Sequence, residues 1–248
     1  GSAVKVVNDA RQVIANPEID IVVELIGGSG IAKQLVLEAI AAGKHVVTAN
    51  KALLAVHGTE IFAAAHKKGV MVAFEAAVAG GIPIIKALRE GLTANSIQWV
   101  AGIINGTTNF ILSEMRDKGL DFGDVLKEAQ RLGYAEADPT FDIEGVDAAH
   151  KVTLMSAIAF GIPVQFDKAY VEGITKLGAA DIKYAEQLGY RIKLLAIIKD
   201  NDGEVELSVE PTLVPKEHMI ASVSDSFNAV FVKGDIVDDT MYYGRGAG

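Results

Sequence analysis

Short, almost uniformly apolar runs alternate with helical patterns over the first third of the chain. The apolar runs are rich in Val, Ile and Ala and cover 19–27, 44–50 and 70–78. Runs of this length and composition are typical of strands buried on both faces. Between them, 31–43 and 52–69 carry helical patterns that end in glycine, a common residue just after a helix. The alternation with short links predicts βαβ units on a parallel sheet.

The pattern changes between residues 75 and 95, and strict alternation does not continue after that point. Further strands are expected at 96–105, 190–200 and 204–214, and further helices at 80–91, 106–119, 121–133 and 146–160. We expect a threonine to cap the helix at 106–119 and Asp121 to cap the next one. The predicted fold class is therefore α/β, with a partial Rossmann-like parallel sheet followed by a mixed α+β domain.

Composition narrows the function classes. The 248 residues contain 32 acids against 23 bases, with no run rich in Lys or Arg, which argues against a nucleic-acid-binding surface. No apolar run approaches the roughly 18 residues of a membrane span. There is no cysteine, which excludes disulfides and a thiol nucleophile and is compatible with a reducing compartment. We expect a cytoplasmic protein that acts on a small molecule.

Two short motifs follow predicted strands of the first domain. "GGSG", with Gly27 and Gly28, is either a plain tight turn or a cofactor contact. "TANK" places Thr48, Asn50 and Lys51 at the carboxyl end of a strand, the edge where ligands bind open parallel sheets. Lys51 also falls at a helix N-terminus, which is electrostatically unfavourable for a cation. This position favours a functional lysine over a solvated one.

Two further links between a strand and a helix are rich in small or polar residues. "FEAAVAGGIPII", at 74–85, would let the backbone approach a ligand or a monovalent cation closely, although tight packing between domains explains it equally well. "NGTT", with Thr107 in it, offers hydroxyl groups and free amides at a helix start, where carboxylates or amides of small polar ligands bind.

The acidic stretch 134–151 runs directly into an apolar helix. Asp147 and Lys151 are four residues apart, so they share one helix face, and that face continues with apolar residues. The pair is therefore expected to be partly buried, with Asp147 orienting a lysine that can give a proton to a carbonyl oxygen as hydride arrives. Glu136 and Asp142 could bind the ammonium group of an amino-acid-like substrate. The alternative is an acidic loop with a structural ion pair.

Several long segments, in this order along the chain, resemble the homoserine dehydrogenase family. They are "VVELIGG", "GKHVVTANKALLA", "FEAAVAGGIPIIKALREGL", "GIINGTTNFIL", "LGYAEADPTFDIEGVDAAHK" and "YYGRGAG". The resemblance implies reversible reduction of L-aspartate 4-semialdehyde to L-homoserine with NADPH or NADH. The reaction belongs to threonine, methionine and isoleucine biosynthesis. The resemblance also implies a homodimer paired through sheet elements of the second domain.

Residue roles follow from the same resemblance. Lys151 and Lys51 are implied as catalytic residues. Substrate binding is implied for Glu136, Asp142, Asp147 and Thr107. Cofactor binding is implied for Gly27, Gly28, Thr48, Asn50, Lys51 and Gly246. A sodium ion is implied at Glu75, Val78, Gly80 and Ile82, mainly through backbone oxygens.

The chain also departs from the family pattern. A glycine-rich opening turn is absent, and the sequence stops at "GRGAG". We therefore expect a fragment, with half of the nucleotide-binding domain at 1–80, a substrate-binding and dimerisation domain at 81–235 and a returning segment at 236–248. Such a fragment is expected to bind cofactor poorly and to be inactive through truncation.

There are three alternatives to this activity. Aspartate semialdehyde dehydrogenase works through a cysteine and is excluded by its absence here. Another nicotinamide-dependent oxidoreductase of the same architecture stays open, as does a non-catalytic core module. The choice between NAD and NADP also stays open.

Overall fold

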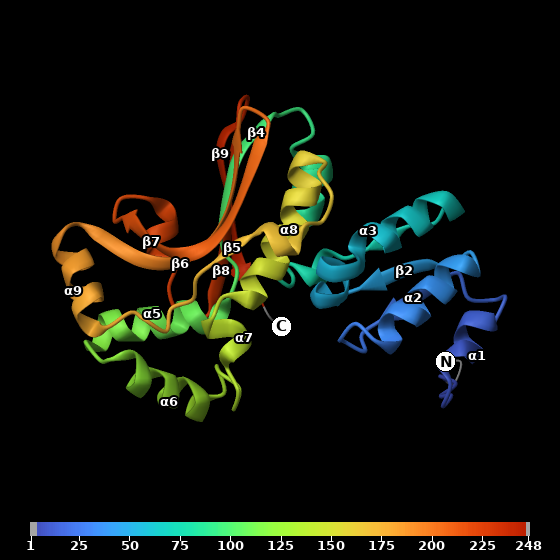
Figure 1. Cartoon of the computed structure of the whole chain (residues 1–248), viewed down its shortest axis with the longest axis horizontal. Helices are drawn as coiled ribbons and strands as arrows, with labels where there is room; N and C mark the ends of the chain where they lie inside the picture. The colour runs from blue at the N-terminus through green and yellow to red at the C-terminus, as the bar shows by residue number, and fades with distance from the viewer. Residues whose placement is uncertain (1–3, 247–248) are drawn as a thin grey trace.

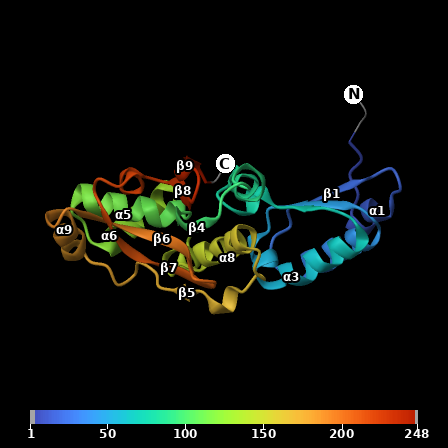
Figure 2. The ribbon, with the colours of Figure 1, turned by 90° about the horizontal axis from the view of Figure 1, so that it is seen from above.

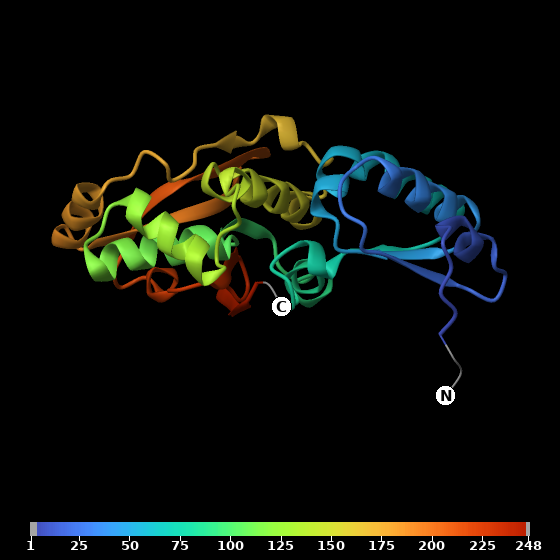
Figure 3. The same cartoon turned by 90° about the horizontal axis from the view of Figure 1, so that it is seen from below.

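The molecule is elongated and consists of two lobes that meet near its middle (Figure 1). The computed structural model describes residues 4–246. The first lobe holds a three-stranded sheet and the second a six-stranded sheet, and α8 (Val146–Phe160) packs along the second sheet and against α3 (Lys51–Lys68) of the first lobe. Seen from above and from below, the end of β9 (Asp238–Arg245) returns to the junction of the two lobes (Figures 2 and 3).

The first lobe has a parallel sheet, as predicted. Its strands are β1 (Ile21–Glu24), β2 (His45–Thr48) and β3 (Val72–Ala73), in that spatial order. The connecting helices are α2 (Ile31–Ala41) and α3, preceded by the short α1 (Ala10–Ala15). Because all strands run the same way, the carboxyl ends of β1 and β2 lie at one edge.

A compact connection leads from the first sheet to the second. It contains the 3₁₀ turn η1 (Glu75–Ala77), then α4 (Ile84–Lys86), which continues as the π-helical turn η2 (Ala87–Gly91). Pro83 precedes α4, where a residue without an N–H is tolerated. The expected helix at 80–91 is therefore present, although its second half is π-helical.

The second lobe is built on a mixed sheet in the order β5-β7-β6-β4-β8-β9. Its strands, with β9, are β4 (Ile97–Ile103), β5 (Tyr170–Val171), β6 (Tyr190–Asn201), β7 (Glu204–Pro215) and β8 (Phe227–Gly234). All neighbouring strands are antiparallel except β5 and β7, which are parallel. The predicted fold class, a partial Rossmann-like sheet followed by a mixed α+β unit, is confirmed.

Helices cover one face of this sheet and form the main core with it. They are α5 (Gly106–Lys118), α6 (Phe122–Leu132), α7 (Thr140–Ile143), α8 and α9 (Ala179–Gln187). The 3₁₀ turns η3 (Phe166–Lys168) and η4 (Met219–Ser222) complete the lobe. A smaller apolar cluster lies on the other face, around Leu195 and Phe231. None of the helices within residues 4–246 has the length and apolar character needed to cross a membrane.

Two details of helix capping differ from the prediction. Asn105, not a threonine, caps α5: its side-chain oxygen accepts a hydrogen bond from the Thr108 amide at 2.9 Å. Asp121 does precede α6, but its carboxylate accepts from the amide of Ala179 at 3.0 Å and makes no capping bond. The Asp121 carboxylate therefore binds a segment 58 residues away, and this contact cannot be predicted from the local sequence.

Candidate active site

A cavity of about 450 Å³ lies where the two lobes meet. It is lined from the first lobe and the connection by Ala49, Lys51, Ala76, Ala77, Ala79 and Gly80. The second lobe contributes residues 104–107, Gly133, Tyr134, Asp142, Asp147, Lys151, Ser226, Asn228, Arg245 and Gly246. The carboxyl end of β2 thus faces the start of α5 and the acidic turn before α8.

Asp147 is the centre of this cavity's polar network. It is only 5 % exposed, and its carboxylate receives Lys51 at 3.0 Å on Oδ1 and Lys151 at 2.7 Å on Oδ2. Burial alone would raise the pKa of Asp147, but the charges of Lys151 and Lys51 and the hydrogen bonds from Lys151 and Asn105 outweigh it, so the pKa lies below its ordinary value. One buried carboxylate therefore holds two lysines from different lobes.

Lys151 is held by two acceptors. Its ammonium group donates to the Asp147 carboxylate and to the backbone oxygen of Ile104, both at 2.7 Å. A lysine ammonium has three N–H groups, so one donor remains while the side chain lines the cavity. The predicted i, i+4 pair is confirmed as buried, and its geometry leaves Lys151 oriented with one proton free for a ligand.

Asn105 joins the two acidic residues and was not predicted to do so. Its amide nitrogen donates to Asp142 at 2.7 Å and to Asp147 at 2.9 Å, while its oxygen caps α5. Burial raises the pKa of Asp142, and the nearby charge of Asp147 raises it further, against the hydrogen bond from Asn105. Asn105 is 37 and 42 residues away from the two acids in sequence, so local patterns do not predict this bridge. The polar cluster at the start of α5 is the one sequence feature that points to it.

The turn between α7 and α8 sets the spacing of the two acids. Gly145 has φ +82°, a left-handed conformation that suits glycine. Gly173 packs directly on this turn, since a Cβ there would lie 2.1 Å from the Ile143 carbonyl oxygen. These two glycines allow Asp142 and Asp147 to approach the same point from consecutive helices.

The loop after β1 is fixed by side chains of the sheet edge. Glu24 is 4 % exposed, and its carboxylate accepts from Thr48 Oγ1 at 2.7 Å and from the amides of Ile26 and Gly27 at 2.7 and 3.2 Å. Asn50 donates to the Gly28 oxygen at 2.7 Å. The loop is therefore preformed, but the Gly27 amide is already used within it.

The predicted site residues fall into two groups. The cavity brings together Lys51, Lys151, Asp142, Asp147, Thr107, Gly80 and Gly246. In the described part of the chain, the remaining predicted residues do not line it: Glu136, Gly27, Gly28, Thr48, Asn50, Glu75, Val78 and Ile82. Thr107 donates to the Tyr134 oxygen at 2.8 Å.

The predicted sodium-site residues have other partners. The Glu75 carboxylate accepts from the amides of Ile85 and Lys86 at 2.8 and 2.9 Å, which caps α4. Residues 4–246 contain no cluster of three His, Asp or Glu side chains that could hold a metal ion. A site built from backbone oxygens is not of that kind, and the sodium site stays a prediction.

The returning C-terminal segment closes one side of the cavity. Gly246 passes directly over the side chain of Asn228, because a Cβ on this glycine would lie 2.0 Å from the Asn228 amide nitrogen. Asn228 is 2 % exposed, and its Oδ1 has no hydrogen-bond partner within residues 4–246. The guanidinium of Arg245 lies over the Phe227 ring at 5.3 Å from the centroid. Gly246 belongs to the predicted cofactor-binding residues, whereas no sequence pattern indicates Asn228 or Arg245.

The fold and the cavity define a two-domain protein of the nucleotide-binding type, whose ligand edge faces an acid–lysine site on the second lobe. Family models agree with this class: "Homoserine dehydrogenase, NAD binding domain" matches residues 2–75 and "Homoserine dehydrogenase" matches residues 83–248. The chain belongs to the homoserine dehydrogenase family.

Individual relatives give the same result. A homoserine dehydrogenase from Pseudomonas aeruginosa is 66% identical over 99% of this chain and 57% of its own length. A crystal structure of a homoserine dehydrogenase from Thiobacillus denitrificans has a TM-score of 0.96 and 69% identity, covering 97% of this chain and 56% of that one. The structure of a hyperthermophilic archaeal homoserine dehydrogenase in complex with NADPH has a TM-score of 0.82 and 26% identity. The match covers 97% of this chain and 70% of that one. The chain therefore spans a little over half the length of the first two relatives.

Proposed function

We propose that this chain carries the substrate pocket of a homoserine dehydrogenase, which interconverts L-homoserine and L-aspartate 4-semialdehyde with NAD or NADP. The observation that carries the proposal is the Lys51–Asp147–Lys151 cluster, which joins the two lobes at the cavity. Family membership and two-lobed relatives of the same name support it. The expected cytoplasmic location is part of the same proposal.

Lys151 is the proton-transfer residue in this proposal. During reduction its free N–H gives a proton to the carbonyl oxygen of the semialdehyde, and during oxidation its neutral amine takes the hydroxyl proton of homoserine. Asp147 and the Ile104 oxygen hold the amine in place through both directions. Lys51, whose side chain is one-third exposed, adds a second positive charge beside the same oxygen.

The acidic residues suit the ammonium group of the substrate. Asp142 is half-buried at the cavity, and Asn105 fixes one of its oxygens, so the other can accept from an ammonium. Thr107 lies at the start of α5, where free amides favour the substrate carboxylate. Glu136 is exposed outside the cavity, so its predicted role requires a movement of the loop that carries it.

The first lobe fits a nicotinamide cofactor at its sheet edge. Gly27 and Gly28 both have positive φ, and no atom lies within 4 Å of a Cβ built on either, so the loop leaves open space at the sheet edge. Gly27, Gly28, Thr48, Asn50 and Lys51 would form or support this edge, and Gly246 would close it from the second lobe. The bound cofactor supplies or accepts the hydride. The first lobe would hold the cofactor at this sheet edge, which faces the substrate pocket of the second lobe.

The first test is binding of L-homoserine to this chain by calorimetry, followed by NADP⁺ reduction at alkaline pH. Lys151→Ala should abolish turnover, whereas Lys127→Ala, on an exposed position of α6, should retain it. Binding without turnover would support the substrate pocket and the expectation that this length of chain handles the cofactor poorly. Absence of L-homoserine binding at millimolar concentration would refute the proposal.

The open alternatives give different results in the same assay. Another nicotinamide-dependent oxidoreductase would prefer sugar aldehydes to aspartate semialdehyde as substrate. A non-catalytic core module would bind neither homoserine nor semialdehyde, yet would unfold cooperatively.

We also propose a homodimer formed through the open face of the second sheet. Trp99, Ile197 and Val214 line an apolar depression of about 310 Å³ on this face, and Trp99 and Ile197 are partly exposed. Such a patch on an antiparallel sheet favours an interface. Sedimentation should give a dimer, and Ile197→Glu should give a monomer. A monomeric parent chain at micromolar concentration would refute this part.

A further inference from the structure

The segment 221–228 runs from the end of η4 into the start of β8 and forms one wall of the active-site cavity. Ser226 and Asn228 line the cavity from this segment. The first residue of α5 packs tightly against it, because a Cβ on Gly106 would lie 2.8 Å from the Ser226 backbone oxygen. Asp225 has φ +56°, an uncommon conformation for a residue with a side chain. A displacement of this segment would therefore change both the cavity and the helix start that faces it.

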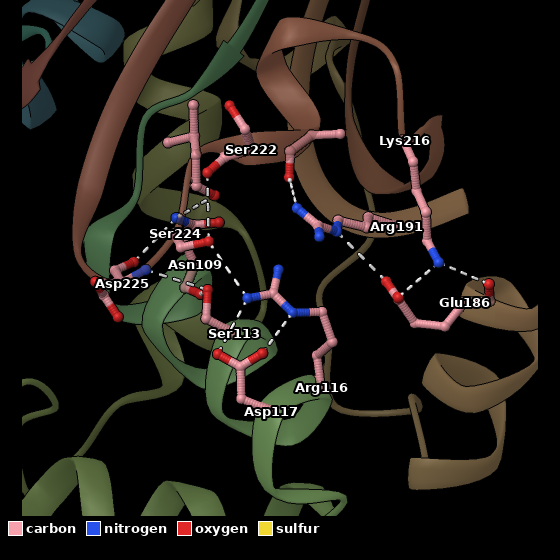
Figure 4. A network of polar contacts seen from close by, with 12 residues as sticks. Asn109, Ser113, Arg116, Asp117, Glu186, Arg191, Lys216, Ser222, Ser224 and Asp225 are labelled. Carbon is pink, nitrogen blue, oxygen red and sulfur yellow. Dashed lines mark hydrogen bonds and ion pairs between the residues drawn. The ribbon is translucent and has the colours of Figure 1, made fainter. Parts of the chain in front are cut away.

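Polar side chains of α5 hold the segment by its backbone (Figure 4). Asn109 is 2 % exposed and donates to the oxygens of Asp225 and Val223 at 2.9 and 3.3 Å. Ser113 accepts from the Asp225 amide at 3.2 Å, and Arg116 donates to the Ser224 hydroxyl at 3.3 Å. Asn109 and Ser113 are themselves joined, since Ser113 donates to the Asn109 oxygen at 2.8 Å.

Lys193, on β6 of the second sheet, also holds this segment. Its side chain is 1 % exposed, and its amine donates to the Val223 backbone oxygen and to Asn109 Oδ1, the latter at 3.2 Å. Side chains alternate along a strand, so Lys193 shares its face with Leu195 and Ile197 of the smaller apolar cluster. A lysine in such surroundings is costly and needs these partners.

The charged groups around Lys193 are mixed. Arg116 and Asp117 face it from α5, Arg191 faces it from its own strand, and Asp225 faces it from the segment. Burial, then the charges of Arg116 and Arg191, lower the pKa of Lys193 to about 7, against the opposing charges of Asp117 and Asp225. The mechanism proposed above makes no use of this lysine.

We propose that Lys193 is a positioning residue that holds segment 221–228 where Ser226 and Asn228 form the cavity wall. Its place in the homoserine reaction rests on the proposed function, whereas its hold on the segment does not. Without its amine, the Val223 oxygen and the Asn109 side chain would lose a buried donor, and the segment would open more readily.

The pH dependence of this opening has a defined sign. When the segment opens, Lys193 meets water and regains an ordinary lysine pKa, so opening takes up a proton between pH 7 and about 10. Opening must then become rarer as pH rises, by up to about tenfold per pH unit. Below pH 7 the dependence disappears, because the lysine is protonated in both states.

Native-state hydrogen exchange between pH 6 and 9 tests the proposal without turnover. After correction for intrinsic exchange, amides of 221–228 should gain protection with pH above 7, whereas those of β7 should not. In Lys193→Met, the protection of these amides should no longer depend on pH in this way. At pH 9 their protection factors should be at least tenfold lower than in the parent protein. Lys183→Met, an exposed lysine of α9, should behave as the parent.

Each result decides the proposal. Absence of a pH slope at 221–228 in the parent protein overturns it, even if Lys193→Met does not fold. An unchanged slope in a folded Lys193→Met does the same.

Kinetics then connect the segment to the reaction. Lys193→Met should raise the KM for L-homoserine about tenfold while kcat changes less than threefold, because the cavity wall and not the proton-transfer lysine is disturbed. A tenfold fall in kcat with an unchanged KM would contradict the positioning role. If the parent chain binds L-homoserine without turnover, the dissociation constant for L-homoserine replaces the KM in this comparison. A parent chain that does not bind L-homoserine would count against the proposed function only, since exchange still reports on Lys193.

Discussion

Replacing Asp147 by asparagine removes the carboxylate charge that pairs with both lysines of the cavity. Asparagine has nearly the same shape, so the change tests the charge and not the packing. The carboxylate is buried, and it meets Lys151 and Lys51 at 2.7 and 3.0 Å. The substitution therefore leaves the ammonium groups of Lys51 and Lys151 next to a neutral amide, with no carboxylate to pair with at this position.

The size of the effect follows from distance and exposure. With an effective dielectric constant of about 20, a contact of this length is worth about 6 kcal/mol before desolvation is subtracted. Lys51 is one-third exposed and recovers much of its hydration, whereas the Lys151 side chain is 13 % exposed and does not. Removing one partner of such a buried pair typically costs about 3–5 kcal/mol, and we expect Asp147→Asn to fall in that range.

Urea unfolding at pH 7 measures this cost directly. In Asp147→Asn/Lys151→Met the buried cation is gone as well, so the double variant should lose at least about 2 kcal/mol less than the two single losses added together. Asp124→Asn, which removes an exposed partner 3.7 Å from Lys127, should stay within about 0.5 kcal/mol of the parent. A loss below about 1 kcal/mol for Asp147→Asn, or strict additivity in the double variant, would refute the reasoning.

Three further outcomes are expected. Gly173→Ala should lower the free energy of unfolding by more than about 3 kcal/mol in urea titration, because its Cβ would lie 2.1 Å from the backbone oxygen of Ile143; a mild effect would contradict this packing. The folded-state pKa of Lys193 lies below its ordinary value, so stability in urea titration should rise between pH 7 and about 10 by roughly 3–4 kcal/mol more in the parent than in Lys193→Met. Asn105→Ala should shift the NMR-measured pKa of Asp142 upward, since it removes a hydrogen bond to the ionised form; a downward shift would refute that role.

Much of the fold could be predicted because its elements carry their own patterns. The parallel strands of the first lobe are short apolar runs between amphipathic helices, and β6 and β7 are long runs joined by an Asn-Asp-Gly turn. The elements after 215 were not predicted. β9 begins with two aspartates and is a strand because it pairs with β8 along its whole length. Its structure comes from tertiary pairing and not from local propensity.

The candidate site was predictable as far as helix geometry reaches. Asp147 and Lys151 share a helix face by their spacing, and the apolar continuation of that face indicated burial. Lys51 was identified as unusual from its position at a helix start, but nothing in the sequence showed that it shares Asp147 with Lys151. The same holds for Asn105 and Asn228, whose partners are distant in sequence and near only after the lobes and strands have assembled.

The acidic stretch before α8 also has a physical explanation in the assembled site. Of its five carboxylates, Glu136 and Glu144 are exposed, and Asp138 accepts from the amide and hydroxyl of Thr140 to shape the turn. Only two acids reach the cavity, and they balance the two lysines there. Burying two lysines against a single aspartate would leave a net positive site that repels the ammonium group of an amino acid. Asp142 supplies the second negative charge. Burial and the neighbouring charge of Asp147 raise its pKa, so a cationic ligand would stabilise the ionised form of Asp142.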